Sequence, residues 1–194
     1  MPVNAWLNYW GLKAQAMLLL LIGQREPARQ KFQQMVTLWP NNRYALASLA
    51  HVLAQLGDKH AAINALNRLT TAFPNNAAAW FNLGFILEEI GRRSEGEMAF
   101  RRALEVDPKL DRAWYGLALI LIHGRRFEEA VQALKKNTEL QPMSPYGWYQ
   151  LARVHVDRHE PDEAVKIIRH LKGFEPKVAA QLERETGLKT AQAS

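Results

Sequence analysis

Apolar side chains in the stretch 77–110 recur three and four positions apart, the spacing of one face of an α-helix. The first such face consists of Trp80, Leu83, Leu87 and Ile90. Gly91 follows it directly, and a glycine just past a helix end readily takes the left-handed conformation that closes a helix. A second apolar face, with Met98, Ala99, Ala103 and Val106, lies between Ser94 and Pro108. The pattern predicts a hairpin of two helices, and small residues at Gly84 and Gly96 let these helices approach closely.

This hairpin pattern repeats along the chain with a constant period. Five prolines are each 34 residues apart: Pro40, Pro74, Pro108, Pro142 and Pro176. Other residue types keep the same phase, among them Trp80, Trp114 and Trp148, and Leu49, Leu83, Leu117 and Leu151. Gly23 and Gly57 hold the place of Gly91, whereas in the fourth repeat the glycine lies one position earlier, at Gly124. A period of this length is typical of stacked repeats.

We therefore expect one repeat array with a cap at its C-terminal end. The predicted repeats cover residues 1–176, at about 9–42, 43–76, 77–110, 111–144 and 145–176, after an N-terminal extension 1–8. Residues 177–187 predict a capping helix, with Val178 and Leu182 turned inward, because a terminal repeat must cover its apolar face. Residues 188–194 are expected to form a disordered tail.

The third repeat resembles the tetratricopeptide repeat family, whose unit carries Trp, Leu, Gly and Tyr on its first helix and Ala, Phe, Ala and Pro after it. The matching residues are Trp80, Leu83, Gly84, Phe100, Ala103 and Pro108, with Leu87 where Tyr is usual and Gly96 where Ala is usual. The resemblance implies an all-α, right-handed α-solenoid. It also implies a non-catalytic scaffold that holds a partner's peptide or helix in a concave groove lined by the first helices.

The repeat positions that line the groove in this family correspond to twelve residues of this chain. They are Tyr44, His51, Phe81, Asn82, Phe85, Glu89, Arg112, Tyr115, Tyr146, Tyr149, Gln150 and Arg153. The lining is aromatic, and aromatic side chains dominate the energetics of protein interfaces. Alternatively, Phe81, Tyr115 and Tyr149 pack between adjacent first helices. The phases that hold a peptide carboxylate in co-chaperones of this family carry no matching Lys and Asn set, so that function is disfavoured.

Charge leaves an alternative open. The net charge of +6 comes mainly from residues 1–76, which hold seven Lys and Arg against two acids. A basic ladder on the second helices consists of Arg68, Arg101, Arg102, Lys135, Lys136, Arg169 and His170. Such a row could contact the phosphates of a nucleic acid or another polyanion. Glu105 and Glu139 lie four residues after Arg101 and Lys135, however, which favours a solvated, partly neutralised helix face.

The N-terminal aromatics Trp6, Tyr9 and Trp10 lie, together with Leu7, on the helix that should face water. They either fold back onto the first repeat as a staple or form a self-association surface, which would make the protein a homo-oligomer.

Catalysis, cofactors and metals are not expected. The chain has no cysteine, no serine in a nucleophile elbow and no glycine loop that cradles phosphate. His155 and His159 are four residues apart, but without a placed carboxylate the pair is a weak metal signal, and His155 occupies a phase usually filled by a buried Tyr. The longest apolar run has seven residues, too few to span a membrane. A cytoplasmic protein that binds another protein, rather than a membrane or nucleic acid, is expected.

Overall fold

The computed structural model describes residues 3–190, and their side chains from residue 6 onward. Within this range the chain forms eleven α-helices and no strand. The helices are α1 (Val3–Leu21), α2 (Arg25–Leu38), α3 (Arg43–Gln55), α4 (Lys59–Ala72), α5 (Ala77–Glu89), α6 (Arg93–Val106), α7 (Asp111–His123), α8 (Phe127–Leu140), α9 (Pro145–Asp157), α10 (Pro161–Lys172) and α11 (Pro176–Thr186). The all-α expectation is confirmed.

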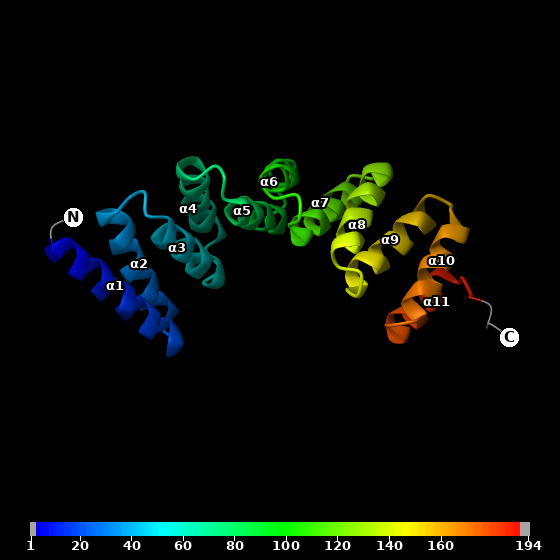
Figure 1. Ribbon diagram of the computed structural model, residues 1–194, viewed down its shortest axis with the longest axis horizontal. Coiled ribbons are helices and arrows are strands. Elements are labelled where there is room, and N and C mark those ends of the chain that lie inside the picture. The colour runs from blue at the N-terminus through cyan, green and yellow to red at the C-terminus, as the bar shows by residue number, and fades with distance from the viewer. Residues whose placement is uncertain (1–2, 191–194) are drawn as a thin grey trace. The chain divides into compact units, whose positions relative to one another are not determined.

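Compact packing divides the chain into two units, 1–106 and 107–194. Unit 1 contains three helical hairpins, α1/α2, α3/α4 and α5/α6, and the second helix of each hairpin packs on the first helix of the next (Figure 1). Unit 2 contains the hairpins α7/α8 and α9/α10, and α11 packs against both helices of the last one. The helix α1 is longer than the other first helices because residues 3–8, expected as a separate extension, continue it.

Each unit has a core made by the facing sides of its hairpins. Phe32, Leu46, Leu66 and Phe100 are fully buried in unit 1, and Leu121, Leu134, Ile168 and Leu182 in unit 2. Gly84 is where α5 and α6 come closest. A Cβ atom at this position would lie 2.8 Å from the Phe100 ring and 3.1 Å from the Gly96 carbonyl oxygen. The expected close approach of the two helices is therefore confirmed.

The turn inside each hairpin requires one residue in the left-handed conformation. Gly23, Gly57 and Gly91 supply it, with φ of 77°, 84° and 80°. In the last two hairpins the same phase holds Arg125 and His159, with φ of 55° and 59°. Gly124 has a φ of −79°, so our assignment of the turn in the fourth repeat to Gly124 was wrong. The period of 34 is kept by backbone conformation even where the glycine is missing.

The periodic tryptophans have a hydrogen-bonding role that their phase alone did not reveal. The Nε1 of Trp80 donates to the Pro74 carbonyl at 2.8 Å. Trp114 donates in the same way to Pro108, and Trp148 to Pro142, both also at 2.8 Å. Each tryptophan thus ties the start of a first helix to the loop before it, which fixes where that hairpin begins.

Unit 2 contains one buried polar contact that replaces an apolar one. Asn137 on α8 is buried, and its Nδ2 donates to the Asp111 carbonyl at 3.0 Å. A Cβ atom on Gly147 of α9 would collide with the Asn137 Oδ1 atom. Between the second and third repeats the same two phases hold Leu69 and Ala79. The glycine at 147 therefore makes room for the asparagine.

The C-terminal segment is more ordered than expected. Thr190 is buried, and both its backbone amide and its hydroxyl donate to Glu183 Oε1, at 3.0 and 2.8 Å. Lys172 also reaches this oxygen, at 2.8 Å. Residues 188–190 thus pack on α11, because Thr190 bonds to Glu183 and the Leu188 amide donates to the Thr186 hydroxyl. Residues 191–194 lie outside the described range.

None of the helices in the described range is long and apolar enough to cross a membrane.

Candidate protein interaction site

The first helices of unit 1 carry an exposed aromatic ring on a buried aromatic base. Phe85 on α5 is 50% exposed. Its ring stacks on that of Phe81 at a centroid distance of 6.4 Å, and Phe81 packs on the buried Phe100 at 5.8 Å. Phe81 is half-buried, so it belongs both to the surface and to the helix contact. The three rings hold Phe85 in place while leaving half of it in water.

Tyr44 on α3 forms a second aromatic position of unit 1. Its ring contacts the buried Phe32 edge-on at 6.2 Å, and its hydroxyl donates to the Met17 sulfur at 3.1 Å. The Lys13 ammonium lies 4.2 Å from the Tyr44 ring centroid and 4.8 Å from that of Trp10. Lys13 and Met17 were not among the expected groove residues. Their phase predicted a position on the first helix but not a contact with Tyr44.

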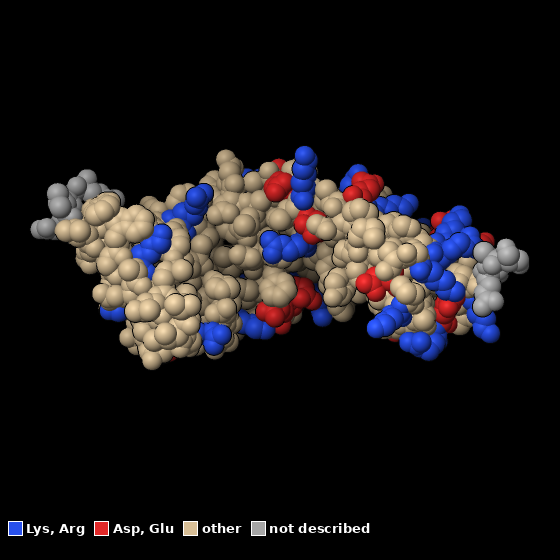
Figure 2. Space-filling model, turned by 60° about the horizontal axis from the view of Figure 1, so that its bottom comes forward, with Lys and Arg blue, Asp and Glu red and all other residues tan. Residues whose placement is uncertain are grey.

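The polar members of the expected groove in unit 1 are His51, Asn82 and Glu89, and all three are exposed. Glu89 lies 3.4 Å from the Lys59 ammonium. His51 shares its phase with Met17 and Phe85, so one exposed position recurs on α1, α3 and α5. Figure 2 shows that charged side chains are sparse over the N-terminal end of unit 1. This surface combines apolar and aromatic side chains with hydrogen-bonding groups.

The N-terminal aromatics divide between the two roles that the sequence left open. Tyr9 is half-buried and packs edge-on against Trp39 at the end of α2, at 5.3 Å. Trp6 and Trp10 remain exposed and contact each other edge-on at 6.0 Å. Tyr9 is therefore the staple onto the first hairpin, and the tryptophans are surface residues. Their role in self-association stays a prediction.

The expected groove residues of unit 2 are less free. The Tyr149 hydroxyl donates to Glu185 Oε2 on α11 at 2.6 Å, and the Arg153 guanidinium lies 5.8 Å from the Tyr149 ring centroid. The hydrogen bond to Glu185 raises the pKa of Tyr149. Hydrogen bonds from Tyr149 and Gln181 lower the pKa of Glu185. The capping helix therefore engages the polar end of Tyr149.

The other unit 2 residues of this set differ in exposure. Tyr146 and Arg112 are exposed, whereas Tyr115 and Gln150 are half-buried. The structure thus brings Tyr149, Arg153 and Glu185 together. It gives no comparable cluster for Tyr146.

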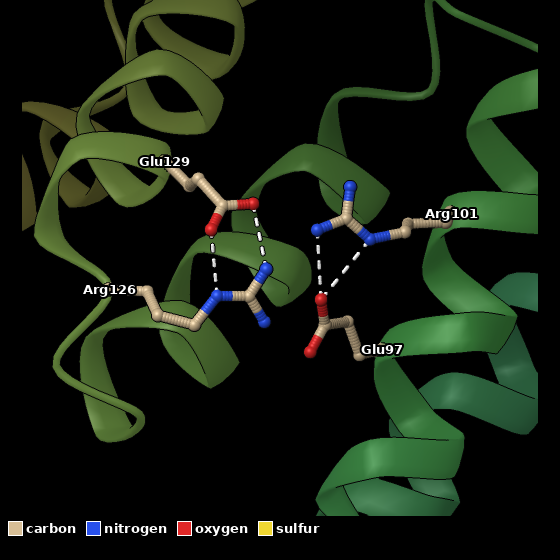
Figure 3. A network of polar contacts seen from close by, with 4 residues as sticks. All are labelled: Glu97, Arg101, Arg126 and Glu129. Carbon is tan, nitrogen blue, oxygen red and sulfur yellow. Dashed lines mark hydrogen bonds and ion pairs between the residues drawn. The ribbon is translucent and has the colours of Figure 1, made fainter.

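Three members of the basic ladder on the second helices, Arg101, Arg102 and Lys136, pair with acids, as does the nearby Arg126. Arg101 bonds to Glu97 at 2.8 Å within α6, and Arg126 to Glu129 at 2.7 Å at the start of α8 (Figure 3). Arg102 pairs with Glu105, and Lys136 with Glu139, at 2.5 and 2.8 Å. The acids expected four residues after Arg101 and Lys135 thus pair with the neighbouring bases, three residues away. Partial neutralisation of this face is confirmed, with different partners.

His155 is buried, as its phase predicted. Its Nδ1 lies 2.7 Å from Glu160 Oε2, and Glu160 also pairs with Arg158 at 2.9 Å. This histidine therefore has a structural partner at the turn before α10. Among the described residues, no three His, Asp or Glu side chains are grouped so that they could hold a metal ion.

Family models described as tetratricopeptide repeat match residues 45–86 and 87–145, together more than half of the chain. No curated protein sequence matches it significantly. Solved structures with a similar fold include a MamA fragment from Desulfovibrio magneticus, with a TM-score of 0.78 and 20% identity over 93% of this chain and 98% of that one.

Two further structures share the fold at similarly low identity. PilF from Pseudomonas aeruginosa has a TM-score of 0.69 and 19% identity, over 94% of this chain and 93% of its own. YrrB, described as a TPR protein with an unusual peptide-binding site, has a TM-score of 0.75 and 16% identity, over 87% and 88%. At these identities the structures show the fold alone, an all-α solenoid. With the periodic residues and both family models in agreement, the chain belongs to the tetratricopeptide repeat family.

Proposed function

We propose that this protein is a non-catalytic scaffold that binds a partner protein through the first helices of unit 1. The binding surface, called here the unit 1 face, consists of Lys13, Met17, Tyr44, His51, Phe81, Asn82, Phe85 and Glu89. The observation that carries the proposal is Phe85, a half-exposed ring held in place by a stack that ends in the core.

The chemistry of this face favours an apolar or amphipathic segment as the ligand. A rigid aromatic ring loses little conformational entropy on binding and buries a large apolar area, so such side chains are common hot spots. Asn82 and His51 are exposed and can hydrogen-bond a peptide backbone. Lys13 is the one Lys or Arg residue of the unit 1 face, and its ammonium already lies against two aromatic rings. The face therefore lacks the pair of cations that would hold a carboxylate. A peptide or helix with large apolar side chains suits the face better than a free C-terminus.

The aromatic residues of unit 2 support a different role. Because Tyr149 is bonded to Glu185, removing its side chain would disturb the packing of α11 as well as any binding. Variants at Tyr149 therefore report on stability and binding together. Phe85 is the sharper probe, since half of its side chain contributes nothing to the core.

The alternative function is binding of a nucleic acid or another polyanion through the basic ladder. The pairing of Arg101, Arg102 and Lys136 with acids weighs against it. The two proposals differ in their response to salt. Binding to phosphates weakens steeply as the salt concentration rises, because condensed counterions are released. Binding to an apolar face depends on salt much less.

The experiment uses a library of random peptides displayed on phage, selected on the full chain at physiological salt. Selected peptides are then titrated against wild type, Phe85→Ala and the control Met98→Ala. Met98 is 64% exposed on the second helix α6, so it matches Phe85 as an exposed apolar side chain away from the unit 1 face. We expect Phe85→Ala to weaken binding by about 2 kcal/mol, the scale of a hot-spot truncation, and Met98→Ala to leave it unchanged.

A different result would contradict binding at the unit 1 face. If selected peptides are rich in acidic residues, bind Phe85→Ala as well as wild type and are released by salt, the unit 1 face is not the binding site. Circular dichroism of both variants separates loss of binding from loss of fold.

A further inference from the structure

The outward side of α1 carries an apolar seam that nothing in the described chain covers. Its members are Leu7, Gly11, Ala14, Leu18 and Leu21, spaced four, three, four and three residues apart. Leu7, Leu18 and Leu21 are 58%, 60% and 83% exposed, and a Cβ atom at Gly11 would meet nothing within 4 Å. Alternating spacings of three and four form the stripe by which one helix packs along another.

Comparison of α1 with the other four first helices shows which parts of this seam are particular to it. At the phase of Leu21 the others carry Gln55, Glu89, His123 and Asp157, and at the phase of Ala14 they carry Ser48, Asn82, Gly116 and Gln150. A leucine exposed to this degree has no packing role within the chain. The repeat pattern does not require it, because polar residues serve at the same position four times.

A third phase argues against another repeat stacked on α1. The other first helices each bury a leucine there, namely Leu49, Leu83, Leu117 and Leu151. In α1 this phase holds Gln15, which is exposed. A stacked hairpin would need to bury this glutamine, and burying an amide without a hydrogen-bond partner is costly. At the phases of Gly11 and Leu18 the other first helices bury apolar residues such as Ala45 and Val52, so α1 keeps part of the stacking face, and Gln15 interrupts it. The seam therefore suits a single helix that lies along Leu7, Gly11, Ala14 and Leu18 and leaves Gln15 in water.

We propose that this helix is α1 of a second copy of the chain, packed antiparallel so that the protein forms a two-fold symmetric dimer. Leu7, Gly11, Ala14 and Leu18 are spaced four, three and four residues apart. This series of a leucine, two small residues and a leucine therefore reads the same in both directions about the midpoint between residues 12 and 13. In an antiparallel pair Leu7 therefore faces Leu18 of the other copy, and Gly11 faces Ala14. A two-fold interface needs exactly this self-complementarity.

Charge complementarity supports the antiparallel orientation. The first turn of α1 has no acidic residue and its last turn has no basic residue, so its own side chains compensate neither end of the helix dipole. Antiparallel packing places the negative end of each α1 beside the positive end of the other. The single charged residue of α1, Lys13, is directed at Trp10 and Tyr44, so no like charges meet across the seam. A membrane surface fits less well, because helices that lie on membranes are rich in Lys and Arg.

The first test is the mass of the full chain by sedimentation equilibrium across a concentration series. Wild type should approach twice the monomer mass as the concentration rises. Leu7→Ser combined with Leu18→Ser should remain a monomer over the same range. Met98→Ser is the matched control, since it removes an exposed apolar side chain of the same unit, and it should dimerise as wild type does. Circular dichroism establishes that the variants are folded.

The second test fixes the orientation. The chain contains no cysteine, so Leu7→Cys and Leu18→Cys each introduce a single thiol. One variant is labelled with ¹⁵N, the two are mixed and oxidised mildly, and intact masses identify the cross-linked pairs. The antiparallel dimer predicts disulfides between the two variants in clear excess over disulfides within either one.

Three results would overturn the proposal. They are a wild type that stays monomeric at high concentration, a Leu7→Ser, Leu18→Ser variant that dimerises like wild type, and cross-links formed mainly within a single variant. Binding of wild type to neutral lipid vesicles, lost in the double variant and without dimerisation in solution, would assign the seam to a membrane surface instead. The proposal is independent of the unit 1 face, so Phe85→Ala should dimerise normally.

Discussion

Asn137 and Gly147 provide a quantitative test of how the hairpins of unit 2 pack. Replacing Gly147 with alanine puts a Cβ atom against the Asn137 Oδ1 atom and 3.1 Å from the Thr138 Cγ2 atom. Overpacking of a core typically costs about 1–3 kcal/mol. Displacing the amide also breaks its hydrogen bond to Asp111, and an unsatisfied buried group costs a further ~1–3 kcal/mol. Alanine regains ~1 kcal/mol of helix propensity relative to glycine. We expect a net loss of about 1–5 kcal/mol in the free energy of unfolding.

Combining Gly147→Ala with Asn137→Ala tests whether the two residues compensate each other. Asn137→Ala alone loses one hydrogen bond and should cost about 1–2 kcal/mol. Together with Gly147→Ala it removes the colliding atom, so the double variant should be more stable than Gly147→Ala alone. The coupling between the two sites should be at least ~1.5 kcal/mol, within the range for residues in contact. Urea unfolding followed by circular dichroism measures all four proteins. Additive losses would show that the two residues do not compensate each other.

Three other predictions concern the turns, the C-terminal segment and the α5/α6 contact. Arg125→Gly should stabilise the protein by about 0.5–1 kcal/mol in thermal unfolding, because a side chain in the left-handed region is strained, whereas Gly124→Ala should change little since its φ is −79°. Hydrogen bonds from Lys172 and Thr190 lower the pKa of Glu183 to about 2, so its stabilising contribution is complete above the unfolded pKa of ~4.3 and is lost as the pH falls towards 2. The melting temperatures of wild type and Glu183→Gln should therefore differ at pH 7 and converge near pH 2. Gly84→Ala should lower the free energy of unfolding by about 1–3 kcal/mol, because its Cβ would lie 2.8 Å from the Phe100 ring, and an unchanged value in urea unfolding would contradict the close helix contact.

The hairpins could be predicted from sequence because the signals for them are local. A period of 34, apolar faces at helical spacing and a glycine after the first helix together locate the helices and most of the turns, although Gly124 misplaced the turn of the fourth repeat by one residue. The turns at Arg125 and His159 could not be predicted from residue type, since a residue other than glycine rarely takes the left-handed conformation, even though histidine takes it more often than most. Their phase alone, five positions at a constant interval, would have found them. The hydrogen bonds from the tryptophans to the prolines six residues earlier recur with the same period, but the phase of the tryptophans did not reveal them.

The candidate site was harder to predict because it depends on contacts between helices. Phase predicted that Phe85 and Tyr149 would both lie on first helices, but it did not distinguish a ring left in water from a hydroxyl bonded to Glu185. That bond involves a residue of the capping helix, which lies outside the repeat. The order of residues 188–190 had no signal in composition, because it depends on one carboxylate, Glu183, that accepts two hydrogen bonds from Thr190.

The most direct test of the central claim is a map of ligand binding at residue level. The full chain, labelled with ¹⁵N, is titrated with a peptide selected from the random library, and amide chemical shifts are followed by NMR. We predict saturable shifts on α1, α3 and α5, centred on Phe85 and Asn82, with second-helix residues such as Arg102 unaffected. Shifts confined to the basic positions of α4, α6 and α8, abolished by added salt, would contradict it.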